Sequence, residues 1–195
     1  MTSTEDGDRH RPDPVFRRTG RELLHQSWII SLWRTTVVGP DGTVFDREIV
    51  HHPGAVAVVP ITDTGSVLLV RQYRAAVDRW LYEVPAGTRD VAGEPAATTA
   101  ARELTEEVGR TAGRFDLLTR CLNTPGICDE VTEVFLATDL RMADPDRQGV
   151  EERYLTVEEV PLDRFDGLVD DGTIVDAVTI LGVALARRRL DRATR

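Results

Sequence analysis

Residues 87–109 read GTRDVAGEPAATTAARELTEEVG, and this stretch decides how the rest of the chain is interpreted. Pro95 suits the first position of a helix, and Gly109 suits the position just after a helix ends. Between them, apolar side chains recur at helical spacing, namely Ala97, Ala100, Ala101, Leu104 and Val108. The stretch therefore predicts a loop followed by an amphipathic helix.

The polar side of this helix carries three carboxylates. Glu103, Glu106 and Glu107 are spaced i, i+3 and i+4, which puts neighbours about 5–6 Å apart on one face. Their like charges repel, and Arg102, four residues before Glu106, offsets only part of that charge. A solvated acidic face is one reading of such a run. The glycines on both sides of it favour a second reading, a site for a hard divalent cation.

The spacing of the whole stretch is more specific than the acidic run alone. With x for any residue, it is Gly87-x6-Glu94-x7-Arg102-Glu103-Leu104-x-Glu106-Glu107-x-Gly109. This pattern resembles the Nudix box, the signature of Nudix hydrolases, at eight of its nine specified positions. It departs from the signature because the first gap is one residue longer than the usual five and because Arg110 replaces the final hydrophobic residue. The extra loop residue leaves the helix glutamates in register.

The resemblance implies hydrolysis of a nucleoside diphosphate linked to another group, with two or more Mg²⁺ ions, or Mn²⁺, per site. By the family pattern the metal ligands are the carboxylates of Glu103 and Glu107 and the backbone carbonyl of Ala86, with Glu106 a ligand or a near neighbour. Oxygen ligands of this kind suit hard cations, which neutralise a diphosphate and activate water. Arg102 is expected to orient a glutamate.

A loop glutamate is the catalytic base that the same family pattern implies. The chain carries two adjacent candidates shortly before Leu155. Glu151 is the first choice and Glu152 the reserve. The prediction for catalysis therefore combines this base with Glu106 and Arg102 of the helix.

Outside the box, most of the chain resembles ADP-ribose pyrophosphatases. The matching segments are Arg47-Glu48-Ile49, Arg71-Gln72-Tyr73-Arg74, Glu83-Val84-Pro85-Ala86-Gly87, Thr124-Pro125-Gly126 and Asp129-Glu130. Pro125 lies sixteen residues after Gly109, where that subfamily carries a proline. The expected reaction is Mg²⁺-dependent hydrolysis of ADP-ribose to AMP and ribose 5-phosphate.

The resemblance also implies how the substrate is held. Arg47 would bracket the adenine, and Glu48 would serve the adenine edge or the metal-side network. Arg74 would meet the diphosphate, and Glu130 the far ribose. The remaining substrate candidates are Thr124, Pro125, Gly126 and, more weakly, Trp28.

Two other functions stay open. The first is a Nudix hydrolase of another nucleoside diphosphate sugar or of a dinucleotide. The second is a catalytically silent sensor that binds ADP-ribose, although a binder would not need the box glutamates and a loop glutamate.

Composition and charge argue against other classes of protein. The net charge of −9 argues against a nucleic-acid partner, because such proteins carry basic surfaces. Two cysteines imply no disulfide framework. The first residues do not resemble a signal peptide, and no apolar run approaches the ~18 residues of a membrane span. We therefore expect a cytoplasmic enzyme with a small-molecule substrate and no membrane partner.

The chain is expected to fold in three parts. Residues 1–20 are polar and predict a mobile tail, residues 21–53 a β-strand extension, and residues 54–195 the Nudix hydrolase domain. The extension reads as two strands around a turn, which is marginal alone. A second subunit could cover it, and the resemblance also implies a homodimer.

The order of elements predicts the fold class. Strands are expected at residues 55–61, 66–73, 81–84, 115–122, 132–140 and 154–157, with a last helix over 174–189. Ile174, Val178, Leu181 and Leu185 are expected to form the apolar side of that helix. Interleaved strands and helices favour an α/β fold, the Nudix fold, with an α/β/α sandwich around a mixed sheet.

Overall fold

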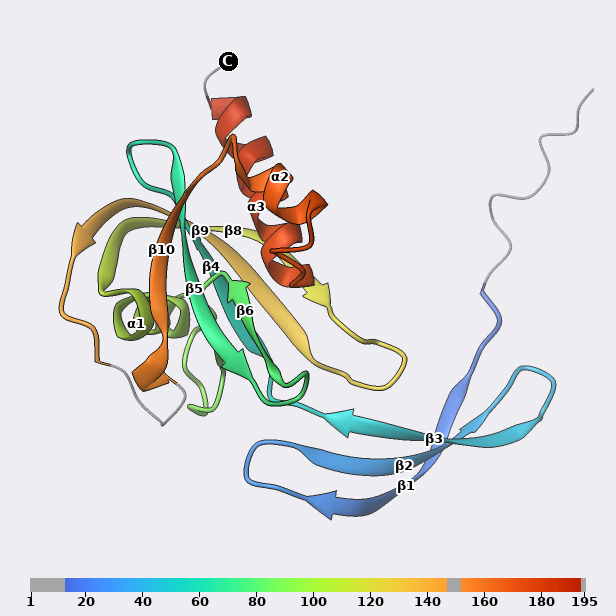
Figure 1. Ribbon diagram of the computed structural model, residues 1–195. Coiled ribbons are helices and arrows are strands. Elements are labelled where there is room, and N and C mark those ends of the chain that lie inside the picture. The colour runs from blue at the N-terminus through green and yellow to red at the C-terminus, as the bar shows by residue number, and fades with distance from the viewer. Residues whose placement is uncertain (1–12, 147–151, 194–195) are drawn as a thin grey trace, which may run out of the picture. The chain divides into compact units, whose positions relative to one another are not determined.

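The structure is a computed structural model that describes residues 13–146 and 152–193. The chain divides into two compact units, Met1–His51 and His52–Arg195, each of which is described by itself (Figure 1). The predicted boundary between the extension and the main domain lies two residues further along. None of the helices in the described ranges is long and apolar enough to cross a membrane.

The first unit is a three-stranded antiparallel sheet in the order β1-β2-β3. Its strands are β1 (Arg17–Gln26), β2 (Ser31–Val38) and β3 (Val44–His51). The two strands predicted around a turn in this extension are present as β2 and β3, which pair without a register shift. β1 was not predicted, and it includes residues 17–20, which were expected to belong to the tail. Its side chains are almost all exposed, so its sequence lacks the alternation that identifies a half-buried strand.

In the described part of the second unit, seven strands form two sheets. A four-stranded sheet has the order β7-β4-β9-β8, and a three-stranded sheet the order β10-β5-β6. β4 and β9 pair in parallel and the other neighbours are antiparallel, so the predicted mixed sheet is confirmed. The strands are β4 (Ala55–Pro60), β5 (Ser66–Arg74), β6 (Arg79–Glu83), β7 (Ala86–Thr88), β8 (Arg110–Leu122), β9 (Val131–Met142) and β10 (Thr156–Pro161).

Helices cover both faces of these strands. They are α1 (Ala96–Val108), α2 (Phe165–Asp170) and α3 (Ala177–Ala193), with a short 3-10 helix η1 (Glu152–Tyr154). Successive residues of a strand point to opposite faces. Accordingly, Val58 packs in the same cluster as Leu104 of α1, and Val59 in the same cluster as Val183 of α3. Figure 1 shows α1 and α3 on opposite sides of the strands, so the predicted α/β/α sandwich is confirmed.

The last third of the chain departs from the prediction in detail. The strand expected over 154–157 begins at Thr156, after η1, and α2 was not predicted. The buried face of α3 consists of Thr179, Gly182, Val183 and Ala186, whereas Leu181 is exposed. A Cβ at Gly182 would lie 2.9 Å from a methyl carbon of Val59. Small residues therefore face the sheet because α3 packs closely against it.

Candidate active site

The predicted box helix forms as α1 and is entered from β7. Pro95 was predicted to be the first helical residue, but with φ −62° and ψ 138° it is the residue before the helix, which begins at Ala96. Gly109 ends the helix in the left-handed conformation at φ 66°, and its N–H donates to Thr105 O. Glycine is the residue that adopts this conformation at least cost, which explains the predicted stop.

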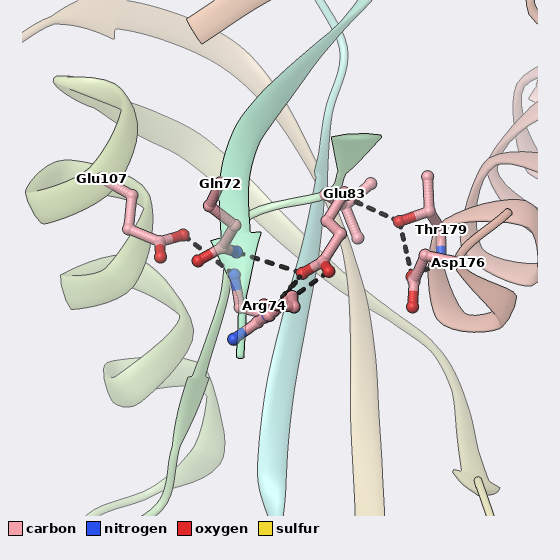
Figure 2. Close-up of polar contacts among 8 residues, drawn as sticks. Gln72, Arg74, Glu83, Glu107, Asp176 and Thr179 are labelled. Atoms are coloured by element: carbon pink, nitrogen blue, oxygen red, sulfur yellow. Dashed lines mark hydrogen bonds and ion pairs between the residues drawn. The ribbon is translucent and has the colours of Figure 1, made fainter. Parts of the chain in front are cut away.

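Two glutamates of α1 lie against the backbone of β7. The Ala86 N–H donates to Glu107 Oε2 at 3.0 Å, and Figure 2 shows Glu107 pointing from α1 toward the strands. A Cβ at Gly87 would lie only 2.1 Å from Cδ of Glu103. The exposed fractions of Glu103 and Glu107 are 9% and 4%. Gly87 is therefore required for Glu103 to lie over this backbone.

Arg102 connects the acidic groups of the box. Its Nη1 lies 2.9 Å from Glu103 Oε1 and 2.9 Å from Glu106 Oε2, and its Nη2 lies 3.8 Å from Glu94 Oε2. Burial acts to lower the pKa of Arg102, but the charges of Glu103 and Glu106 lead the effects that raise it above its ordinary value. Glu94 also accepts a hydrogen bond from Thr99 Oγ1 at 2.7 Å. The first glutamate of the box thus ties the loop to the helix.

The donor chemistry of this region suits a hard divalent cation. Carboxylate oxygens on α1 lie beside backbone groups of β7, and oxygen is the ligand that Mg²⁺ prefers. Within residues 13–146 and 152–193, however, no three His, Cys, Asp or Glu side chains are grouped closely enough to hold a metal ion as they stand. Arg102 Nη1 instead contacts both Glu103 and Glu106.

A pocket of about 280 Å³ lies beside β7 in the second unit. Ala86 and Gly87 line it, so the backbone that contacts the α1 glutamates is also a wall of the pocket. Its polar lining comes from the strands β5, β6 and β9, from the connection between β3 and β4, from the loop between β8 and β9, and from the residue just before α3. The lining side chains with polar groups are His52, Arg74, Glu83, Asn123, Glu130, Thr132 and Asp176, with Thr88 from β7.

Arg74 is held by a carboxylate from the neighbouring strand. Its Nε lies 3.0 and 3.1 Å from the two oxygens of Glu83, and its Nη2 lies 2.5 Å from Glu83 Oε2 (Figure 2). Burial acts to lower the pKa of Arg74. The hydrogen bonds and charge of Glu83, with the charges of Glu107 and Asp176, raise that pKa above its ordinary value. Arg74 therefore stays a cation at the pocket wall.

The start of α3 is joined to the segment that follows β6. The Val84 N–H donates to Thr179 Oγ1 at 2.9 Å, and that hydroxyl donates to Asp176 Oδ2 at 2.7 Å (Figure 2). Asp176 Oδ2 also accepts from the Thr179 N–H at 2.7 Å, as a helix-capping carboxylate does. Thr179 is fully buried, so this contact satisfies a donor that would otherwise be costly.

His52 and Glu130 line another side of the pocket. The His52 N–H donates to Asp129 Oδ1 at 3.0 Å, and His52 Nδ1 accepts from the Gly54 N–H at 3.1 Å. Glu130 Oε1 lies 4.0 Å from that same Nδ1. At 4.0 Å, the approach of Glu130 to Nδ1 is too long for a hydrogen bond.

The structure brings together part of the predicted site. Glu103 and Glu107 lie against the β7 backbone that contains Ala86, and Arg102 joins Glu103 to Glu106 on α1. Two predicted substrate residues, Arg74 and Glu130, line the pocket. Thr124, Pro125 and Gly126 lie in the loop after β8, where Asn123 lines the pocket instead. Trp28, Arg47 and Glu48 belong to the first unit.

The predicted base is not described. Glu151 lies outside the described residues, and Glu152 is the first residue of η1. Sequence reasoning gave no role to Glu83, Asn123 or Asp176, which line the pocket. Glu83 begins the segment 83–87, which resembles ADP-ribose pyrophosphatases. That resemblance was the one feature of the sequence that could have indicated a role for Glu83.

Comparisons with known proteins agree with this geometry. The NUDIX domain family matches residues 51–177. The chain is 42% identical over 168 residues to an ADP-ribose pyrophosphatase of Mycobacterium tuberculosis, covering 86% of this chain and 81% of that protein. It is 37% identical over 163 residues to an ADP-ribose pyrophosphatase of Bacillus subtilis, covering 84% and 88%.

A solved structure of an ADP compounds hydrolase shares the fold. It superposes with a TM-score of 0.80 over 95% of this chain and 98% of that chain, at 22% identity. At that identity the likeness concerns the fold alone. The matched residues include the strands β4 to β10 and the box helix, with every residue of the pocket lining except Val178. The chain therefore belongs to the Nudix hydrolase family.

Proposed function

We propose that this protein hydrolyses the pyrophosphate bond of ADP-ribose to AMP and ribose 5-phosphate with the help of Mg²⁺. One observation carries the proposal. The backbone of β7 lies between the α1 carboxylates and the pocket, so a diphosphate in the pocket would lie next to the cation site. Similarity to two ADP-ribose pyrophosphatases over more than four fifths of the chain supports the substrate.

The cation would be held by Glu103, Glu107 and the carbonyl of Ala86, and Glu106 would be a further ligand or a near neighbour of the cation. Two or more Mg²⁺ ions are proposed, with Mn²⁺ as the alternative. A bound divalent cation neutralises diphosphate oxygens and lowers the pKa of water. Gly87 keeps Glu103 over the β7 backbone, and Arg102 offsets the repulsion among the glutamates.

The remaining steps fall to groups around the pocket. Arg74 would donate hydrogen bonds to the diphosphate, and Glu130 would accept them from the far ribose. Glu151 would take the proton from the attacking water, with Glu152 in reserve. We propose that the other predicted residues also bind the substrate, including its adenine. They are Arg47, Glu48, Trp28, Thr124, Pro125 and Gly126.

The first unit supports the proposal of a homodimer. In its described part, residues 13–51, no hydrophobic side chain is buried, and Trp28 is 87% exposed. A small sheet without a core of its own needs cover, which a second copy can supply. Sedimentation velocity at micromolar concentration is expected to give twice the monomer mass. A monomer across that range contradicts the proposal.

The substrate is tested by product analysis. Purified protein is incubated with ADP-ribose, ADP-glucose or GDP-mannose, with Mg²⁺ or with a chelator, and nucleotides are separated by chromatography. We expect AMP from ADP-ribose, release that depends on Mg²⁺, and a higher kcat/KM than for the other two compounds. Faster hydrolysis of GDP-mannose would assign the protein to another substrate, and binding without turnover would make it a sensor.

A further inference from the structure

Glu83 is a nearly buried carboxylate that the proposed reaction does not use. It is 5% exposed and ends β6, beside β5. It accepts hydrogen bonds from Gln72 Nε2 at 3.0 Å and from two nitrogens of Arg74. A buried carboxylate is costly unless it is paired and hydrogen-bonded. Both conditions are met here by side chains of β5.

The pairing leaves one part of the Arg74 guanidinium available. Glu83 takes Nε and Nη2, which form one edge of the planar group. In the described ranges 13–146 and 152–193, the side-chain hydrogen bonds of Arg74 come from Nε and Nη2, and the side chain is 44% exposed at the pocket wall. A planar guanidinium held along one edge has its remaining donors in a fixed direction, so it is ordered before an anion binds.

The chain around Glu83 is itself fixed on both sides. Gln72, on β5, donates a hydrogen bond to the Glu83 carboxylate. Val84, the residue after Glu83, donates its N–H to Thr179 of α3. Figure 2 shows this series of contacts running from Gln72 through Glu83 to Thr179 and Asp176. The position of Glu83 therefore depends on contacts from β5 and α3.

We propose that Glu83 is a positioning residue that orders Arg74 for binding the diphosphate. This inference rests on the proposed function. It differs from the role of the α1 glutamates because Glu83 acts through Arg74 and does not touch the substrate. Its effect on substrate binding must therefore vanish when Arg74 is removed.

A double-mutant cycle tests this dependence. Glu83→Gln is expected to raise KM for ADP-ribose about tenfold while kcat stays within about threefold, and Arg74→Ala is expected to raise KM at least as much. In the Arg74→Ala background, Glu83→Gln is expected to add less than about twofold. Additive effects of the two changes would overturn the proposal, as would an unchanged KM for Glu83→Gln. If Glu83→Gln fails to fold, Glu83→Asp takes its place, since its shorter carboxylate cannot keep the same contacts.

Glu158→Gln is the matched control. Glu158 lies exposed on β10 of the same sheet and accepts a hydrogen bond from Tyr82 Oη at 3.1 Å. It does not line the pocket, so its replacement is expected to leave KM unchanged. If Glu158→Gln raised KM as much as Glu83→Gln, removal of any carboxylate from this sheet would weaken substrate binding. That result would overturn the proposal.

Thermal unfolding tests the pairing without any activity. Glu83→Gln is expected to lower Tm in the wild-type background but to raise it in the Arg74→Ala background, because Arg74→Ala leaves a buried carboxylate without its cation. A lowered Tm in both backgrounds would overturn the pairing.

If no nucleoside diphosphate compound is hydrolysed, the proposed function fails by itself. Calorimetry with inorganic pyrophosphate and Mg²⁺ then decides the positioning role: weaker binding to Glu83→Gln supports it, and equal binding overturns it.

Discussion

Glu107→Gln is expected to lower kcat/KM for ADP-ribose by at least about 100-fold at saturating Mg²⁺. The change removes the negative charge that a divalent cation needs. It keeps the size of the side chain and an amide oxygen that can still accept the Ala86 N–H. The loss should therefore come from the charge, with the fold retained.

Three measurements check this expectation. Steady-state kinetics gives kcat and KM, calorimetric titration with Mg²⁺ gives cation affinity, and thermal unfolding gives Tm. We expect weaker Mg²⁺ binding and a Tm within about 3 °C of the wild type. Turnover within about tenfold of the wild type would show that Glu107 is not a metal ligand.

Gly87→Ala is expected to reduce activity by a similar factor, about 100-fold, for a steric reason. The added methyl carbon would lie 2.1 Å from Glu103 Cδ and 2.2 Å from its Oε1. The far end of a glutamate side chain can move away at little cost, so the fold should survive. The Glu103 carboxylate, however, must leave the β7 backbone, where we propose that it binds the cation.

Gly167→Ala is the matched control for Gly87→Ala. Gly167 lies in α2, and a Cβ there would meet nothing within 4 Å. Both variants are compared for kcat/KM, Mg²⁺ affinity and Tm. We expect Gly167→Ala to behave as wild type, and Gly87→Ala to lose Mg²⁺ affinity while its free energy of unfolding changes by less than about 1 kcal/mol. Full activity of Gly87→Ala would show that the position of Glu103 is not needed.

Local sequence was enough to predict the box helix and the central strands. The helix depends on the spacing of Leu104 and Val108 and on the left-handed conformation of Gly109, which are properties of neighbouring residues. The strands β4 and β5 are short apolar runs bounded by turn formers, and both formed within one residue of the predicted ends. The family could be inferred for the same reason, because the box is one continuous stretch.

Other features carried no local signal. β1 has exposed side chains on both faces, so no alternation marked it as a strand. The buried face of α3 is formed by small residues, and the larger Leu181 is exposed. Only small residues suit that face because α3 lies close to the sheet. A Cβ at Gly182 would already lie 2.9 Å from Val59 of the sheet.

The sequence by itself determined the strands β4 and β5, the box helix and its three acidic side chains, because these follow from the spacing of residues within a few turns of chain. Tertiary structure alone decided that Glu83 pairs with Arg74 and that Asp176, from the other end of the domain, lines the same pocket. These contacts depend on side-chain directions and on packing between separate elements, and no spacing along the chain contains that information.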